Sequence, residues 1–160
     1  MATRVRRVIN KILMGPLALG LCAGLLLAGC AEDYGVDQHG RKVEGQWLVI
    51  NYWAEWCGPC RTEIPELNAL AEQLKGQHTQ VLGVNFDALQ GEALGKAADA
   101  MGIRFTVLAQ DPAERYQLPR SEALPVTYLV DPKGTVRERL MGEQTAAGLG
   151  KRLAELQAKE

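Results

Sequence analysis

Apolar residues along this chain form blocks of two kinds, separated by short polar or glycine-containing segments. Residues 47–53, WLVINYW, are rich in aromatic and β-branched side chains and predict a buried strand. At 61–75 apolar residues recur three or four positions apart and Gly76 follows, which predicts a helix. Later blocks predict helices at 91–101 and 143–157 and strands at 80–85, 104–108, 126–130 and 136–140.

The first 30 residues have the pattern of an export signal. Basic residues up to Lys11 precede an apolar segment at 12–27. The segment closes with Leu27-Ala28-Gly29-Cys30, which resembles the lipobox of bacterial lipoproteins and implies that Cys30 is lipidated and becomes the new N-terminus. The alternative is an uncleaved membrane helix, for which the segment is short against the roughly 20 residues of a span. Either interpretation puts the following domain outside the cytoplasm, attached to a membrane.

These features divide the chain into three parts. We expect a lipoprotein signal peptide at 1–29, a lipidated N-terminus with a polar tether at 30–43, and one folded domain at 44–160. Without the signal, 131 residues carry 14 basic and 19 acidic side chains, a net charge of −5. That balance provides no basic stripe for nucleic acid and no polybasic patch for anionic lipid. Membrane attachment must therefore be covalent or hydrophobic.

Two of the four cysteines, Cys57 and Cys60, lie in the predicted domain. One close pair is too few for a disulfide scaffold, and the second Cys-x-x-Cys of a zinc ribbon is absent. The pair falls at the turn from the strand at 47–53 into the next helix, where backbone N–H groups and the helix dipole favour a negative charge. We therefore expect the pKa of the Cys57 thiol to lie below its usual value. The spacing lets Cys60 reach a mixed disulfide on Cys57, and Gly58 and Pro59 keep the loop tight.

The segment WAEWCGPC at 53–60 resembles the active site of thioredoxins. The following CRTEIP at 60–65 is similar to their extracytoplasmic TlpA/ResA/DsbE-like branch. This resemblance, which covers about residues 45–160, implies an α/β thioredoxin-like fold with a central mixed sheet flanked by helices. It implies that 91–108 is an extra helix–strand insertion and that Pro65 bends the first helix. It also implies that Cys57 is the attacking thiol and Cys60 the resolving one.

Two positions near the cysteines, Asn51 and Glu63, differ in whether their side chains can transfer a proton. Thioredoxins carry a buried aspartate where this chain has Asn51, which cannot titrate. Glu63 lies one helical turn beyond Cys60, and the resemblance implies that it assists proton transfer there. The alternative is a solvated acid favoured by the helix dipole. If Glu63 is buried, desolvation raises its pKa and lets it accept the Cys60 proton.

Residues 121–134 resemble the family segment in which a cis proline opens a strand that faces the two cysteines. The resemblance implies a cis bond at Pro125, with the backbone of Leu124 presented to an extended substrate. Gly142 falls where the family often has a glycine lining the same groove, and the alternative is a simple turn before the last helix. The expected substrate-binding residues are Trp56, Gly58, Pro59, Leu124, Pro125 and Gly142.

Residues and resemblance together predict a thiol–disulfide oxidoreductase, lipid-anchored on the periplasmic side of the bacterial envelope. We expect no metal and no cofactor besides the redox-active Cys57–Cys60 pair. The Gly-Pro insert resembles that of reducing thioredoxins, so we expect reduction of disulfides in envelope proteins. Because the periplasm is oxidising, a membrane partner must then supply electrons.

Four points stay open at this level. Apocytochrome c maturation is a substrate context that the family offers, not one that these residues indicate. The alternative function is that of a disulfide oxidase or isomerase, which uses the same thiol–disulfide exchange in another direction. A copper-handling protein could use the soft thiolates, although no histidine is placed to join them. The pattern does not decide between inner and outer membrane.

Overall fold

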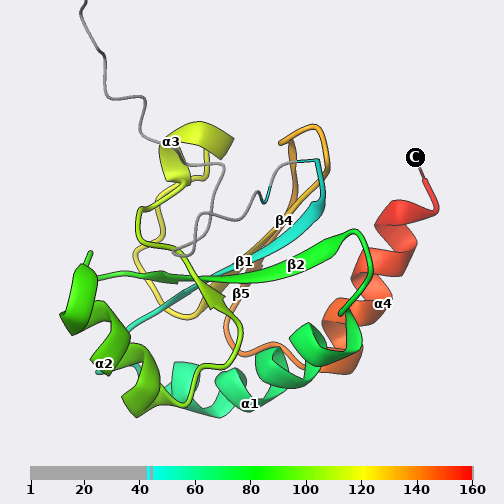
Figure 1. Ribbon diagram of the computed structural model, residues 1–160. Coiled ribbons are helices and arrows are strands. Elements are labelled where there is room, and N and C mark those ends of the chain that lie inside the picture. The colour runs from blue at the N-terminus through cyan, green and yellow to red at the C-terminus, as the bar shows by residue number, and fades with distance from the viewer. Residues whose placement is uncertain (1–42, 44, 160) are drawn as a thin grey trace, which may run out of the picture. The chain divides into compact units, whose positions relative to one another are not determined.

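The computed structural model describes Val43 and residues 45–159. The elements in this part are β1 (Trp47–Trp53), α1 (Gly58–Gln73), β2 (Thr79–Asn85), α2 (Gly91–Met101), β3 (Thr106–Val107), α3 (Ala113–Tyr116), β4 (Val126–Val130), β5 (Val136–Met141) and α4 (Ala146–Gln157) (Figure 1). The signal peptide predicted at 1–29, the lipidation of Cys30 and the tether up to residue 42 lie outside the described residues. None of the helices described has the length and apolar character needed to cross a membrane.

The described strands form one mixed sheet in the order β3-β2-β1-β4-β5. Strand β2 is parallel to β1 and to β3, whereas β4 is antiparallel to β1 and to β5. The predicted hairpin at 126–140 is therefore confirmed, and so is the helix–strand unit, in which α2 leads to β3 at the parallel edge of the sheet. Helices flank the sheet, as predicted.

Strand β1 lies in the centre of the sheet and is buried along its whole length, because both of its faces are covered. Successive side chains of a strand point to opposite faces. Val49 accordingly packs in one cluster with Leu67 of α1 and Leu149 of α4, whereas Ile50 packs in another with Tyr116 of α3. Figure 1 shows α1 and α4 on one side of the sheet and α3 on the other. This double burial explains the uninterrupted apolar pattern of the strand.

Element ends differ from the predictions where side chains replace backbone hydrogen bonds. Helix α4 begins at Ala146 and not at residue 143, because the Thr145 side chain caps it by accepting from Gly148 N at 3.1 Å. The strand predicted at 104–108 is reduced to Thr106–Val107. One reason is that the Arg104 N–H donates to the Asn68 side chain at 2.7 Å and not to a neighbouring strand. The short helix α3 was not predicted.

Candidate redox site

The two cysteines of the domain form a disulfide at the start of α1. Cys57 is the N-cap of the helix, and its Sγ accepts a hydrogen bond from Cys60 N at 3.2 Å. The S–S bond joins residues whose Cα atoms are 5.3 Å apart. Cys57 is 3% exposed and Cys60 is fully buried, so Cys57 carries the sulfur nearer to solvent. The structure thus confirms the predicted turn, with both cysteines in or at the first helical turn.

The residues next to the two cysteines in the chain, Trp56, Gly58 and Pro59, are exposed. A Cβ added at Gly58 would meet no atom within 4 Å, so space is open there. Pro59 stands in the first turn of the helix, where its missing N–H leaves no bond unmade. Trp56 has a large apolar side chain, and 65% of it is exposed. A protein partner can therefore approach Cys57 from this side.

Glu63 lies on the buried side of α1 and is only 1% exposed. Its Oε2 accepts from Asn51 Nδ2 at 2.9 Å, and its Oε1 accepts from the backbone N of Gln144 at 3.1 Å. The same Asn51 amide donates to Thr127 Oγ1 at 3.0 Å. The alternative of a solvated first-turn acid is therefore wrong: Glu63 is a buried carboxyl group bound by β1 and by the segment before α4.

Burial changes the acidity of Glu63. Desolvation raises its pKa to about 7, and the hydrogen bonds from Asn51 and Gln144 oppose the rise. A carboxyl group of this kind gains and loses its proton near neutral pH. This is the condition that we set for Glu63 to accept a proton from Cys60, its neighbour one turn earlier on α1.

The second wall of the site is formed by residues just before β4 and just after β5, the two strands of the antiparallel hairpin. The Leu124–Pro125 bond is cis, as the resemblance implied. Leu124 packs against the cluster that contains Cys57 and Cys60, and Gly142 N donates to Pro125 O at 2.9 Å. Gly142 has φ +78°, a conformation that favours glycine. The structure thus brings Gly142 to Pro125 and places Leu124 against the cluster that contains the cysteines.

Sequence reasoning missed several neighbours of the site. Asp87 accepts from Trp56 Nε1 at 3.0 and 3.2 Å, and Phe86 packs edge-on against the Trp56 ring with centroids 6.1 Å apart. Gln144 binds Glu63 through its backbone, a contact for which a side-chain pattern gives no signal. Thr127 could have been found, because it lies directly opposite Asn51 in the register of β1 and β4.

Comparisons with known proteins agree with this geometry. HelX from Rhodobacter capsulatus, a thiol:disulfide interchange protein, is 34% identical over 116 residues, which are 72% of this chain and 63% of HelX. ResA from Bacillus thuringiensis, a thiol-disulfide oxidoreductase, is 28% identical over 114 residues, 68% of this chain and 65% of ResA. The chain thus spans slightly less than two thirds of the length of either relative.

The fold is also that of a solved structure. The crystal structure of StoA from Bacillus subtilis superposes with a TM-score of 0.59 over 72% of this chain and 90% of StoA, at 20% identity. The predicted thioredoxin-like fold is thereby confirmed. The model of the AhpC/TSA family matches residues 31–139, more than half of the chain. This chain therefore belongs to the AhpC/TSA family and is similar within it to the thiol:disulfide oxidoreductases HelX and ResA.

Proposed function

We propose that this chain is a thiol–disulfide oxidoreductase that reduces disulfides of proteins in the bacterial envelope. The observation that carries the proposal is the Cys57–Cys60 disulfide at the N-terminus of α1, beside the cis peptide bond of Pro125. The similarity to HelX and ResA supports the same reaction class.

The reaction begins with the reduced pair. The Cys57 thiolate attacks one sulfur of a client disulfide, so a Cys57–client bond forms, the client S–S bond breaks, and the released sulfur takes a proton. Cys60 then loses its proton and attacks Cys57 Sγ. The intramolecular disulfide forms, and the second client sulfur leaves and is protonated. The client gains two electrons and two protons.

Two local features favour these steps. The Cys60 N–H points at Cys57 Sγ and, with the helix dipole, favours the thiolate form of Cys57. Glu63 serves as the proton acceptor for Cys60, because its raised pKa of about 7 matches proton exchange at neutral pH. Cys57, Cys60 and Glu63 are thus the proposed catalytic residues.

The client binds in extended form along the groove between the two halves of the site. Leu124 presents its backbone to the client, and Pro125 and Gly142, joined by a hydrogen bond, form the wall behind it. Trp56, Gly58 and Pro59 form the opposite rim, on which the exposed Trp56 ring supplies apolar contact. These six residues are the proposed substrate-binding set.

The proposed setting follows from the N-terminal sequence. Residues 1–29 are removed as a signal peptide, Cys30 is lipidated, and residues up to 43 tether the domain at 44–160 to the membrane on the periplasmic side. An oxidising periplasm requires that a dithiol donor in the membrane re-reduce the pair. Disulfide-containing envelope proteins are the clients, with apocytochrome c as one class among them.

Turnover and redox potential together test this function. With excess dithiol present, the full-length chain should reduce a peptide disulfide catalytically, and Cys57→Ser should abolish turnover. A reduction potential near about −270 mV agrees with a reductase, whereas one near about −120 mV would assign the chain to disulfide oxidation. Turnover that survives Cys57→Ser would remove the assignment of the attacking thiol.

A further inference from the structure

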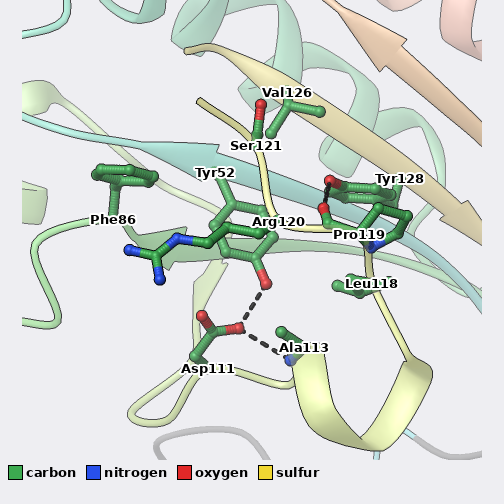
Figure 2. A pocket seen from close by; sticks show the side chains of 10 residues that line it. All are labelled: Tyr52, Phe86, Asp111, Ala113, Leu118, Pro119, Arg120, Ser121, Val126 and Tyr128. Atoms are coloured by element: carbon green, nitrogen blue, oxygen red, sulfur yellow. Dashed lines mark hydrogen bonds between the residues drawn. The ribbon is translucent and has the colours of Figure 1, made fainter. Parts of the chain in front are cut away.

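A cavity of about 320 Å³ opens on the side of the sheet that α3 covers (Figure 2). Aromatic side chains from three segments line it: Tyr52 of β1, Tyr128 of β4 and Phe86, which follows β2. Leu118 and Val126 add aliphatic surface. The mechanism proposed above uses none of these side chains, so the cavity needs an explanation of its own.

The cavity adjoins the redox site at two points. Phe86, on its rim, packs against Trp56, and Trp56 immediately precedes Cys57. Val126, which lines the cavity, immediately follows the cis bond of Pro125. The cavity therefore has lining residues next to both segments that flank the cysteines, the one at Trp56 and the one at Pro125. This position suits a side chain that stands near the target cysteine of the client.

Two of the tyrosines that line the cavity donate hydrogen bonds from their hydroxyl groups, Tyr128 to the backbone O of Pro119 and Tyr52 to Asp111 (Figure 2). Tyr52 Oη donates to Asp111 Oδ1 at 2.5 Å, and the backbone N of Ala113 donates to the same oxygen at 2.9 Å (Figure 2). Burial and the neighbouring Asp111 carboxylate raise the pKa of Tyr52, so its hydroxyl stays a donor. Within the described residues, Oδ2 of Asp111 accepts no hydrogen bond and is available to a ligand.

The charges that line the cavity limit what can enter. Asp111 contributes a carboxylate and Arg120 a guanidinium, and Arg120 has no ion-pair partner in the described part of the chain. An acidic side chain would be attracted by Arg120 but repelled by Asp111, and a basic one would be attracted by Asp111 but repelled by Arg120, so this pair of charges favours neither sign. A neutral side chain with an apolar body avoids both repulsions. Three aromatic rings favour a further aromatic ring in edge-on or offset contact.

We propose that this cavity binds a tyrosine or tryptophan side chain of the client polypeptide, close in sequence to the cysteine that Cys57 attacks. The ring packs among Tyr52, Phe86 and Tyr128, and its O–H or N–H donates to Asp111 Oδ2. The cavity is thus a specificity-determining site. This inference rests on the proposed thiol–disulfide exchange and adds the feature by which clients are selected.

Matched peptide disulfides test the proposal on the full-length chain. The peptides differ only at one position two residues from the cysteine, which carries Tyr, Trp, Ala, Glu or Lys, and the linear bis(2-hydroxyethyl) disulfide serves as a substrate without side chains. Burial of a large aromatic ring predicts that kcat/KM for the Tyr and Trp peptides exceeds that for the Ala peptide by about tenfold or more. The Glu and Lys peptides should not exceed the Ala peptide.

Substitutions in the cavity test whether it causes the predicted preference for Tyr and Trp peptides. Ala113→Leu places a larger side chain in the cavity lining and should lower the Tyr-to-Ala ratio of kcat/KM at least about threefold. Ala147→Leu, on an exposed position of α4, should leave the ratio unchanged. Arg120→Gln should raise kcat/KM for the Lys peptide relative to the Ala peptide.

The outcomes separate this inference from the proposed function. If neither bis(2-hydroxyethyl) disulfide nor any peptide is reduced, the exchange activity itself is absent. If all five peptides are reduced at equal rates, the exchange stands and the cavity proposal is overturned. It is also overturned if Ala113→Leu and Ala147→Leu give the same ratio.

Discussion

The side-chain amide of Asn51 donates a hydrogen bond of 2.9 Å to the buried carboxyl group of Glu63. Thioredoxins have a titratable aspartate at the position of Asn51. In this chain the titratable group is instead Glu63, which stands on α1 one turn after Cys60. The two residues are 12 positions apart in sequence, and the contact joins the central strand to the helix that carries the disulfide. From this arrangement we expect both stability and exchange to depend on the protonation of Glu63.

The free energy of unfolding of the oxidised chain should fall as pH rises from about 4.5 to about 7. Burial raises the pKa of Glu63 from 4.5 to about 7, so the folded state holds this proton more tightly than the unfolded state does. The stabilisation that protonated Glu63 gives to the folded state is fully present below pH 4.5 and lost above pH 7. A shift of this size corresponds to about 3 kcal/mol. Denaturant unfolding of the oxidised chain across this pH range measures the loss.

Glu63→Gln supplies the control for that titration. The variant has no ionisable group at this position, so the fall between pH 4.5 and pH 7 should shrink by about 3 kcal/mol relative to the unsubstituted chain. The same variant should flatten the pH dependence of Cys60 reactivity. Identical pH profiles in both chains would show that Glu63 neither titrates in this range nor assists the thiol.

Asn51→Ala should move the pKa of Glu63 further upward. The Asn51 hydrogen bond stabilises the charged carboxylate, so its removal favours the protonated form. The pH at which the free energy of unfolding stops falling should then be higher in Asn51→Ala than in the unsubstituted chain. Val49→Ala, a truncation of another buried residue of β1, should lower stability at every pH without moving this endpoint. An unmoved endpoint in Asn51→Ala would contradict the role of the amide.

Much of this site could be predicted from sequence because it depends on local patterns. The apolar run at 47–53, the Cys-Gly-Pro-Cys turn and the periodic helix after it are contiguous, and they place Cys57 and Cys60 at the start of α1. The cis bond at Pro125 came from the resemblance, since proline alone does not determine its isomer. The burial of Glu63 could not be predicted, because it depends on Asn51 and Gln144 reaching the helix from distant segments.

Asn68→Ala should destabilise the fold by about 2 kcal/mol. The Asn68 side chain, which is 6% exposed, donates to Gly102 O at 2.9 Å and accepts from Arg104 N at 2.7 Å. Truncation leaves both backbone groups without these partners and loosens the loop between α2 and β3. The control is Gln77→Ala, whose exposed side chain donates to Gln73 O at 3.1 Å and should contribute little. Equal unfolding free energies for the two variants would contradict the prediction.

This contact also explains an error in the predicted edge strand. The pattern at 104–108 indicated a strand, yet Arg104 is bonded to a side chain of α1, and β3 pairs with β2 only through Thr106 and Val107. A side chain that competes for a backbone group leaves no periodic signal. The four-residue helix α3 escaped prediction because a single turn is too short for a helical repeat.

Cys30→Ser should abolish lipid attachment of the chain. The Leu27-Ala28-Gly29-Cys30 segment resembles a lipobox, in which the cysteine sulfur carries the lipid. Metabolic labelling with a radioactive fatty acid should mark the unsubstituted chain and leave the variant unlabelled. Cys22→Ser, inside the predicted signal peptide, should keep the label. Continued labelling of Cys30→Ser would rule out attachment at this residue.

The most direct test of the proposed exchange is to trap its intermediate in the native cell envelope. Cys60→Ser removes the resolving thiol, so the account predicts covalent complexes in which Cys57 is joined to client cysteines, detected by non-reducing electrophoresis and mass spectrometry. Cys57→Ser should trap none. If Cys57→Ser accumulates mixed disulfides through Cys60 and Cys60→Ser does not, the assigned roles are reversed. If neither variant forms them, the chain does not exchange disulfides with envelope proteins.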